Sequence, residues 1–379
     1  MSVNNKIWLS SPHMGGRELK YINEAFQENM VSSSGSNIIG FENSLQTYLG
    51  QDSKVVAVSS GTAAIHLALK LAGVKSTDEV LCQSFTFVAS VNPIMYMGAI
   101  PVFIDSESET WNMCPVKLEE AILDRLSKGF DPKAIVVVHS YGMPAKIDQI
   151  LVVAKKYNIT LIEDAAEALG SSYKGQKCGT FGDYGILSFN GNKIITTSGG
   201  GALVSKKLAD KEKTIFLATQ AKDEAIHYQH SEIGYNYRMS NISAGIGRGQ
   251  IEVLEQRVHS RINMHNFYEE LFEEIIGVSM LNSPNKDFES NYWLTCILIN
   301  ETVAGFSKDT LRKQLSQDGI ESRPLWKPMH LQPIFSDYLH FDTGVSEELF
   351  KNGLCLPSGS NITNIEKQRI KESIYKVLN

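Results

Sequence analysis

One lysine lies in a setting that suits chemistry better than solvent exposure. Lys193 follows Asn190-Gly191-Asn192 and precedes two isoleucines, two threonines, a serine and the glycine run 199–201. Its apolar β-branched neighbours predict a partly buried position. Burial disfavours the ammonium form and leaves a free amine that can attack a carbonyl. The alternative interpretation is a surface lysine beside a glycine-rich turn, and this segment alone does not decide between the two.

Two carboxylates follow an apolar run and suggest what the lysine would hold. Asp164 comes directly after a predicted strand over residues 160–162, and Glu167 lies one helical turn further along. Taken alone, Asp164 could be a turn residue or a helix N-cap. Beside a Schiff-base lysine it has a specific task, because pyridoxal 5′-phosphate (PLP) stores carbanion electrons while its pyridine nitrogen stays protonated. A buried aspartate keeps that proton in place, and Glu167 could hydrogen-bond the 3-oxygen of the same ring.

A phosphate site is predicted where a strand over residues 55–58 gives way to a helix over residues 63–72. The turn between them reads Ser60-Gly61-Thr62-Ala63. Free backbone N–H groups and the positive end of the helix dipole favour an anion at such a turn. Turns of this kind are common, so the signal is weak in isolation. We expect the phosphate to be held by Gly61, Thr62, Ala63 and the hydroxyl of Ser188.

An aromatic ring near a strand end completes the pattern. Phe87, in the run Ser84-Phe85-Thr86-Phe87, could stack on a pyridine face, although a core position explains Phe85 at least as well. The lysine, the acid, the phosphate turn and the ring together describe a single cofactor. This joint pattern is more specific than any of its parts.

The predicted scaffold brings these residues to one edge. From about residue 54, short apolar runs alternate with helical patterns, which is typical of βαβ units around a mostly parallel sheet. Residues 134–138 and 160–162 are predicted strands, and residues 147–157 are the amphipathic helix between them. In open α/β sheets, ligands bind beyond the carboxyl ends of the strands. Asp164 and the turn before residue 63 are expected to meet there.

Chain length predicts two lobes. The 379 residues exceed the roughly 250–300 that one core fills. Past residue 240 we expect a long helix or a broken pair over about 242–276, a strand over 293–299, and a helix from Ser307 that stops at Gly319. A capping box, Thr363-x-x-Glu366, opens a last helix predicted to bury Ile370, Ile374 and Val377. The prediction is a large PLP-binding α/β domain with an N-terminal arm over 1–250, and a smaller α+β domain over 251–379.

Composition excludes several classes of partner. A formal net charge of −6 gives no electrostatic support for nucleic-acid binding. No apolar run approaches the ~18 residues of a membrane span, and the first residues lack the apolar run of a signal peptide. We expect a cytoplasmic protein without a metal site, because the five cysteines are scattered and form no CxxC pair. These are Cys82, Cys114, Cys178, Cys296 and Cys355.

These segments resemble the DegT/DnrJ/EryC1/StrS sugar aminotransferases of the type I PLP fold, which is aspartate aminotransferase-like. The match runs nearly end to end and includes Ser60-Gly61-Thr62-Ala63-Ala64, His139-Ser140-Tyr141-Gly142, Glu163-Asp164-Ala165-Ala166, Lys193, and Gly234-Tyr235-Asn236-Tyr237-Arg238. The resemblance implies that Lys193 forms the Schiff base, that Asp164 pairs with the pyridinium, and that Thr62, Ala63 and Ser188 hold the phosphate. It also implies that Asn236 comes from the neighbouring subunit, in a homodimer with shared active sites.

Within that family the sequence looks most like the aminotransferases of the UDP-N,N′-diacetylbacillosamine pathway. Many family members carry Gln or His in place of Glu167, and Thr-Thr-Gly-Glu-Gly where this chain reads Thr197-Ser198-Gly199. Both variants recur in the bacillosamine-type enzymes. The resemblance implies transfer of the amino group of L-glutamate to C4 of a UDP-2-acetamido-2,6-dideoxy-4-ketohexose. The alternative is another nucleotide-linked ketosugar, such as a dTDP-sugar.

Contacts to the sugar nucleotide are less determined. For each candidate a structural or solvated role competes with direct contact, although Arg323 and His330 match family positions. The candidates are His13, Tyr228, Arg323, Lys327 and His330. His139 could equally be a satisfied buried histidine. Among rival functions, related sugar dehydratases carry histidine in place of Lys193, a non-catalytic aminosugar sensor would not need every cofactor position filled, and an oxidoreductase would show GxGxxG after the first strand.

Overall fold

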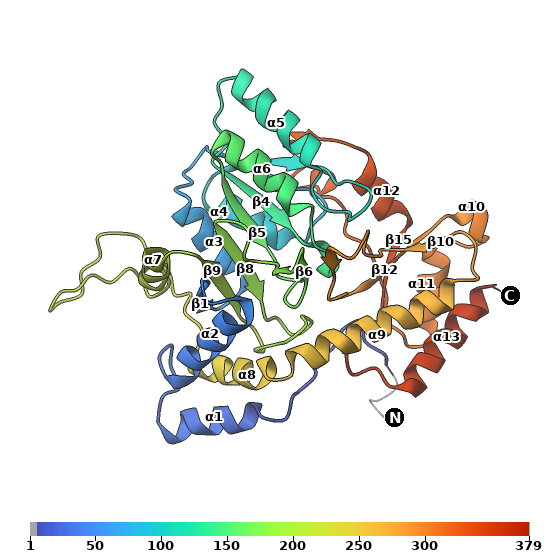
Figure 1. The fold of residues 1–379 in the computed structure, drawn as a ribbon, viewed down its shortest axis with the longest axis horizontal. Helices are drawn as coiled ribbons and strands as arrows, with labels where there is room; N and C mark the ends of the chain where they lie inside the picture. The colour runs from blue at the N-terminus through green and yellow to red at the C-terminus, as the bar shows by residue number, and fades with distance from the viewer. Residues whose placement is uncertain (1–5, 379) are drawn as a thin grey trace.

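The computed structural model describes residues 6–378, and within them the chain builds a large twisted sheet flanked by helices (Figure 1). The strand order is β1-β9-β8-β5-β4-β2-β3-β14. Strand β9 is antiparallel to both of its neighbours, and the pairs from β8 to β14 are parallel. The mostly parallel α/β sheet is therefore confirmed. The bounds are β1 Lys54–Val58, β2 Glu79–Gln83, β3 Ile100–Ile104, β4 Ala134–Val138, β5 Thr160–Asp164, β8 Tyr184–Ser188, β9 Gly201–Ser205 and β14 His340–Phe341.

Helices bury both faces of this sheet, which explains its nearly continuous apolar strands. Side chains alternate along β4: Ala134 and Val136 pack with one set of helices, whereas Ile135 and Val137 pack with the other. The first set is α3 Gly61–Leu71, α4 Asn92–Tyr96 and α7 Leu208–Ala218, and the second is α5 Pro115–Ser127 and α6 Ile147–Tyr157. The helix predicted over 147–157 is thus confirmed.

The predicted helix over about 242–276 is a broken pair, α8 Asn241–Ile251 and α9 Leu254–Phe272. Helices α1 Glu18–Gln27 and α2 Ser36–Leu49 pack on α8 (Figure 1). Close approach there requires glycine, since a Cβ on Gly249 would lie 2.7 Å from the backbone nitrogen of Glu18. From this end α9 runs toward the C-terminal elements.

A second sheet, of order β10-β12-β15-β13, lies in the C-terminal part of the described chain. Its strands are β10 Val278–Met280, β12 Thr295–Ile299, β15 Gly353–Leu356 and β13 Arg323–Pro324, and its helices are α10 Glu301–Ala304, α11 Lys308–Gln317, α12 Val345–Asn352 and α13 Asn364–Leu378. Ser307 caps α11 as predicted, and the Thr363 and Glu366 capping box is present. Val377 was predicted to be buried and is partly exposed, because it lies in the last turn of α13.

Contacts cross the predicted boundary at residue 250 in both directions. Ile7 forms a parallel bridge with Ile320, and β14 pairs with β3 of the large sheet. The division into domains over 1–250 and 251–379 stays a prediction.

A small third sheet joins β11 Phe288–Glu289, β6 Ser172–Tyr173 and β7 Gln176–Lys177. Among residues 6–378, no helix has both the length and the apolar character that crossing a membrane requires.

Candidate active site

A cavity of about 790 Å³ opens at the carboxyl ends of the large sheet. Asp164 lies at the end of β5, and Ser188 lies at the end of the parallel strand β8. The cavity brings together seven of the predicted cofactor residues: Gly61, Thr62, Phe87, Asp164, Glu167, Ser188 and Lys193. The sequence predicts these residues at this same edge of the sheet.

Asp164 is held as a buried acid. Its side chain accepts hydrogen bonds from Ser90 Oγ to Oδ2 (2.7 Å) and from the Ala166 N–H to Oδ1 (3.1 Å). Burial raises the pKa of Asp164, and these two hydrogen bonds oppose the shift. An acid in such a position suits a cationic ring nitrogen, because the attraction between opposite charges is strong where water is excluded.

Lys193 and Glu167 form an ion pair inside the cavity. Lys193 Nζ lies 3.1 Å from Glu167 Oε1, and the Tyr141 N–H donates to Glu167 Oε2 at 2.8 Å. The Lys193 side chain is 13% exposed, so the predicted partial burial is present. Burial raises the pKa of Glu167 to about 7, with the Lys193 charge opposing that shift. Glu167 therefore changes charge close to neutral pH.

The Glu167→Gln variant should remove a pH dependence of stability. The folded-state pKa of Glu167, about 7, is above its ordinary value of 4.5. The protonated carboxyl therefore stabilises the folded state, fully below pH 4.5, and this stabilisation is lost as the pH rises to about 7. We expect the free energy of unfolding to fall by up to about 3 kcal/mol across that window. Urea unfolding of the cofactor-free protein at pH 5 and 7.5 measures the fall, which should shrink in Glu167→Gln.

A matched control is Glu348→Gln, since Glu348 is an exposed glutamate on α12 whose side chain is 64% accessible. This variant should keep the wild-type difference between the two pH values. Asp164 contributes in the same direction and is present in both variants, so it cancels from the comparison. An unchanged pH dependence in Glu167→Gln would contradict the assignment.

The phosphate turn is formed by the N-terminus of α3. Ser60 is its N-cap and accepts the Ala63 N–H through Oγ at 3.0 Å. Gly61 and Thr62 line the cavity, where the first N–H groups of a helix have no acceptor within it. A Cβ on Gly61 would lie 3.2 Å from the Ser188 Cβ, so glycine lets α3 approach β8. Ala63 lies outside the cavity lining, and its N–H donates to the Ser60 cap; its phosphate contact stays a prediction.

The two aromatic candidates, Phe87 and Phe85, differ in burial. Phe87 lines the cavity and is 55% exposed, which leaves its ring free to cover a bound ring. Phe85 is fully buried in the core. The donor set therefore fits PLP: Lys193 supplies an amine for a Schiff base, Asp164 supplies a buried acid for the ring nitrogen, and the α3 N-terminus supplies a phosphate site.

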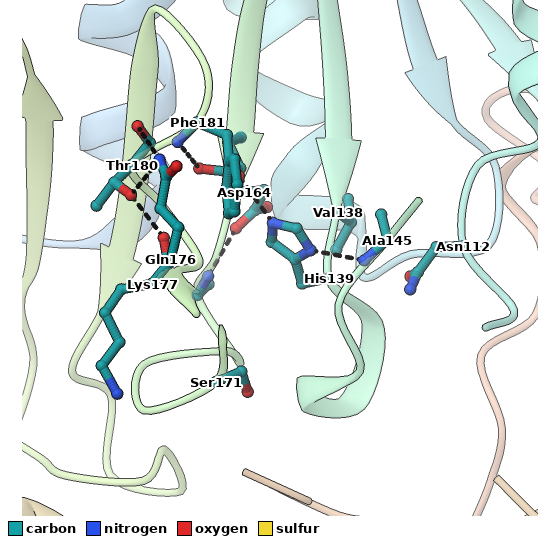
Figure 2. Close-up of polar contacts among 12 residues, drawn as sticks. Asn112, Val138, His139, Ala145, Asp164, Ser171, Gln176, Lys177, Thr180 and Phe181 are labelled. Atoms are coloured by element: carbon teal, nitrogen blue, oxygen red, sulfur yellow. Dashed lines mark hydrogen bonds and ion pairs between the residues drawn. The ribbon is translucent and has the colours of Figure 1, made fainter. Parts of the chain in front are cut away.

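His139 belongs to a buried pair beside the site rather than to the cavity (Figure 2). Its Nε2 lies 3.1 Å from Glu163 Oε2, and its Nδ1 accepts the Ala145 N–H at 2.9 Å. The other oxygen of Glu163 accepts the Phe181 N–H at 3.2 Å. Glu163 and Asp164 are neighbours on β5 and point to opposite faces of the sheet. His139 is thus a satisfied buried histidine.

Of the predicted sugar-nucleotide contacts, Arg323 lies at the cavity. Its side chain is 68% exposed, and its Nη2 lies 2.8 Å from Glu321 Oε1. His330 is buried away from the cavity, with Nδ1 2.7 Å from Ser84 Oγ and Nε2 3.2 Å from Glu347 Oε1. Lys327 also lies outside the cavity lining. Direct substrate contact by His330 and Lys327 has no support from these positions and stays a prediction.

The remaining candidates also lie outside the cavity lining. His13 Nδ1 lies 3.0 Å from Ser360 Oγ, and burial together with Arg257 lowers the pKa of His13. Tyr228 is 82% exposed on a segment that projects beyond α7 (Figure 1). Asn236 is exposed and also lies outside this chain's own cavity. None of the three contacts Lys193 or Asp164 within the described chain.

Sequence reasoning missed three aromatic residues in the cavity wall. Tyr141 stacks on Trp326 with ring centroids 4.3 Å apart, and the Lys193 Nζ lies 4.1 Å from the centroid of Trp293. The family resemblance includes Tyr141 without giving it a role, and the sequence predicts Trp293 only as the start of a strand. The sequence feature that could have indicated these three residues is an aromatic side chain at the end of a strand or in a turn beside the cavity.

This sheet, with a lysine, a buried acid and a helix N-terminus around one cavity, defines a PLP-dependent enzyme of the aminotransferase type. The chain belongs to the DegT/DnrJ/EryC1/StrS aminotransferase family, whose model matches residues 12–375. PLP is its cofactor, as predicted. Within residues 6–378, no group of three or more His, Cys, Asp or Glu side chains could hold a metal ion.

Several relatives of this chain have names that specify an aminotransferase or an aminosugar. It is 51% identical to EpsN of Bacillus subtilis (strain 168), whose name describes a PLP-dependent aminotransferase, over 98% of this chain and 95% of the relative. It is 37% identical to GDP-perosamine synthase of Escherichia coli O157:H7, over 96% of both chains. It is 30% identical to UDP-4-amino-4,6-dideoxy-N-acetyl-beta-L-altrosamine transaminase of Campylobacter jejuni (strain 81-176), over 92% of this chain and 91% of the relative.

The type I fold is confirmed by a solved DegT/DnrJ/EryC1/StrS aminotransferase from Brucella abortus. The TM-score is 0.88 at 28% identity, and the alignment covers 95% of each chain. The chain is therefore a sugar aminotransferase.

Proposed function

We propose that this sugar aminotransferase transfers the amino group of L-glutamate to C4 of a UDP-2-acetamido-2,6-dideoxy-4-ketohexose, giving a UDP-4-amino-4,6-dideoxy-GlcNAc. The observation that carries the chemistry is the joint placement of Lys193 and the buried Asp164 in one cavity. The Campylobacter relative, whose name specifies a UDP-linked 4-amino-4,6-dideoxy sugar, supports the substrate, as does Glu167 in place of Gln or His.

When bound, PLP supplies an electron sink for the carbon that gains or loses a proton. Asp164 would hold the ring nitrogen in its protonated form, because its carboxylate would be attracted to the cationic ring where water is excluded. The Lys193 amine is the group that removes the proton from Cα of glutamate, and later delivers one to C4 of the sugar. Glu167 Oε1 orients Lys193 Nζ at 3.1 Å. Phe87 and the N-terminus of α3, which both line the cavity, would hold the ring and the phosphate.

We also propose a homodimer in which Asn236 completes the neighbouring site. Asn236 follows the projecting segment, residues 222–233, on which apolar side chains face solvent in the single chain. Tyr228 and Ile233 are 82% and 76% exposed. Exposed apolar residues on a projecting segment favour contact with another chain. A cytoplasmic location is part of the proposal, since the five cysteines are free, as expected in a reducing compartment.

The substrate is tested by single turnovers with a panel of ketosugars. The enzyme is first bleached with L-glutamate, and the return of the yellow cofactor band is then followed with UDP-, GDP- and dTDP-linked 4-keto-6-deoxy sugars. We expect the UDP-2-acetamido sugar to react at least about tenfold to a hundredfold faster than the others, because a site that hydrogen-bonds its substrate rejects analogues strongly. Mass spectrometry identifies the aminosugar product.

Recovery of the band with the GDP-sugar or the dTDP-sugar alone would overturn the UDP assignment and leave the aminotransferase in place. The GDP-sugar is included because of the perosamine synthase relative. Failure of L-glutamate to bleach the band, with another amino acid succeeding, would overturn the proposed donor.

A further inference from the structure

The backbone carbonyl directly before Lys193 is held from two remote parts of the chain. The Asn192 oxygen accepts hydrogen bonds from Ser10 Oγ and from Trp293 Nε1, both at 2.7 Å. Ser10 lies in the N-terminal arm, and Trp293 lies just before β12. Lys193 begins its side chain one residue after this doubly bonded carbonyl, so the two donors fix the turn from which the lysine extends.

A buried arginine joins the two donors. Arg261, on α9, is 1% exposed and donates from Nη1 to the Trp293 carbonyl and from Nη2 to Ser10 Oγ at 2.8 Å. Both acceptors are neutral, and a buried guanidinium bonded to neutral oxygens is costly to keep. Its position between Ser10 and Trp293 links the two hydrogen bonds to Asn192 in one network.

The Trp293 ring also contacts the reactive amine itself. Lys193 Nζ lies 4.1 Å from the ring centroid, within the range of a cation–π contact, and Glu167 Oε1 lies 3.1 Å from the same nitrogen. Trp293 is 4% exposed and the Lys193 side chain is 13% exposed, so both partners of the contact are largely buried. The indole therefore acts on Lys193 twice, through its N–H on the preceding carbonyl and through its ring face on the amine.

We propose that Trp293, held by Arg261 and assisted by Ser10, is a positioning residue for Lys193. It fixes the turn at Asn192 and holds the amine ready to bond the cofactor aldehyde or to move a proton. The inference rests on the proposed role of Lys193 and is independent of which ketosugar is used. A merely structural role for Trp293 would instead affect the whole cavity.

Two measurements on cofactor-free full-length protein separate these roles. Rapid mixing with PLP gives the rate constant at which the yellow band forms, which requires the Lys193 amine. Equilibrium binding of pyridoxamine phosphate reports the rest of the site, because that ligand makes no bond to Lys193. We expect Trp293→Leu to lower the rate constant of band formation about tenfold to a hundredfold. The affinity for pyridoxamine phosphate should change by less than about threefold.

Milder variants divide the two contacts. Trp293→Phe keeps a ring and loses the N–H, so its rate constant should fall between those of wild type and Trp293→Leu. Ser10→Ala removes the other donor to Asn192 and should slow band formation a few-fold. The matched control is Trp8→Leu. Trp8 also has a lysine over its ring, with Lys6 Nζ 3.7 Å from the ring centroid, but it is 52% exposed and lies outside the network. It should behave as wild type.

Wild-type rates in Trp293→Leu, or equal losses of band formation and pyridoxamine phosphate affinity, would overturn the proposal. If Trp293→Leu does not fold, Trp293→Phe and Ser10→Ala decide by the same two measurements. Absence of a yellow band in wild type would instead count against Lys193 itself, and so against the proposed function.

Discussion

Lys193→Ala is expected to lower turnover of L-glutamate by at least about 10⁴-fold, since one side chain supplies both the covalent attachment and the proton transfer. No other lysine lines the cavity among the described residues. The variant should still bind pyridoxamine phosphate, because Asp164, the α3 N-terminus and Phe87 remain. It should fold as wild type, since Lys193 lines the cavity and does not pack in the hydrophobic core.

The absorption spectrum with added PLP checks this directly. Wild type should show a yellow band that bleaches with L-glutamate, and Lys193→Ala should show no such protein-bound band. Lys206→Ala is the matched control: Lys206 is an exposed lysine whose Nζ donates to the Phe181 carbonyl, away from the cavity. A yellow band that persists in Lys193→Ala and bleaches with glutamate would show that a different lysine is used.

Asp164→Asn is expected to lower the rate of the glutamate half-reaction by about 10²–10³-fold. The amide is nearly the same size but carries no charge to hold a protonated ring nitrogen. Stability should move in the opposite direction. Burial raises the pKa of Asp164, which shows that the charged form is disfavoured in the folded chain. The cofactor-free Asn variant should therefore be at least as stable as wild type near neutral pH.

Stopped-flow bleaching with L-glutamate and urea unfolding provide the two readouts. Ser90→Ala is the matched control, because it removes the 2.7 Å hydrogen bond to Asp164 Oδ2 and leaves the carboxylate in place. It should cost about tenfold or less in rate. Wild-type bleaching rates in Asp164→Asn would contradict the assigned role, and equal losses in both variants would assign the effect to the hydrogen bond.

The sequence could predict the part of the site that the alternation of strands and helices builds. Strands that alternate with helices bring their carboxyl ends to a common edge, so Asp164 at the end of β5 and the turn before α3 had to lie near one another. Lys193, Ser188 and Phe87 joined them through the chemistry of one cofactor. Strands β4 and β5 and helix α6 were predictable because their apolar patterns are strong and local.

What sequence could not predict depends on packing between distant segments. Trp293 looks like any residue at the start of a strand until the fold brings its ring to Lys193. Arg261 reads as a polar residue of a helix, and its burial follows from the positions of Ser10 and Trp293. His330 was predicted to contact the substrate because it matches a family position, but its side chain pairs with Ser84 and Glu347. The two residues of β14 are too few to give a period.

That late strand bears on how the chain is made. The edge of β3 receives its bonds from the far end of the sequence, with the Phe103 N–H donating to the Leu339 carbonyl at 2.9 Å and the Asp105 N–H to Phe341 at 3.1 Å. During synthesis, β3 therefore emerges more than two hundred residues before the segment that covers it. An uncovered edge strand invites pairing with other chains. The nascent protein therefore carries an open sheet edge until residues 339–341 have been made, and during that time another strand could pair with this edge.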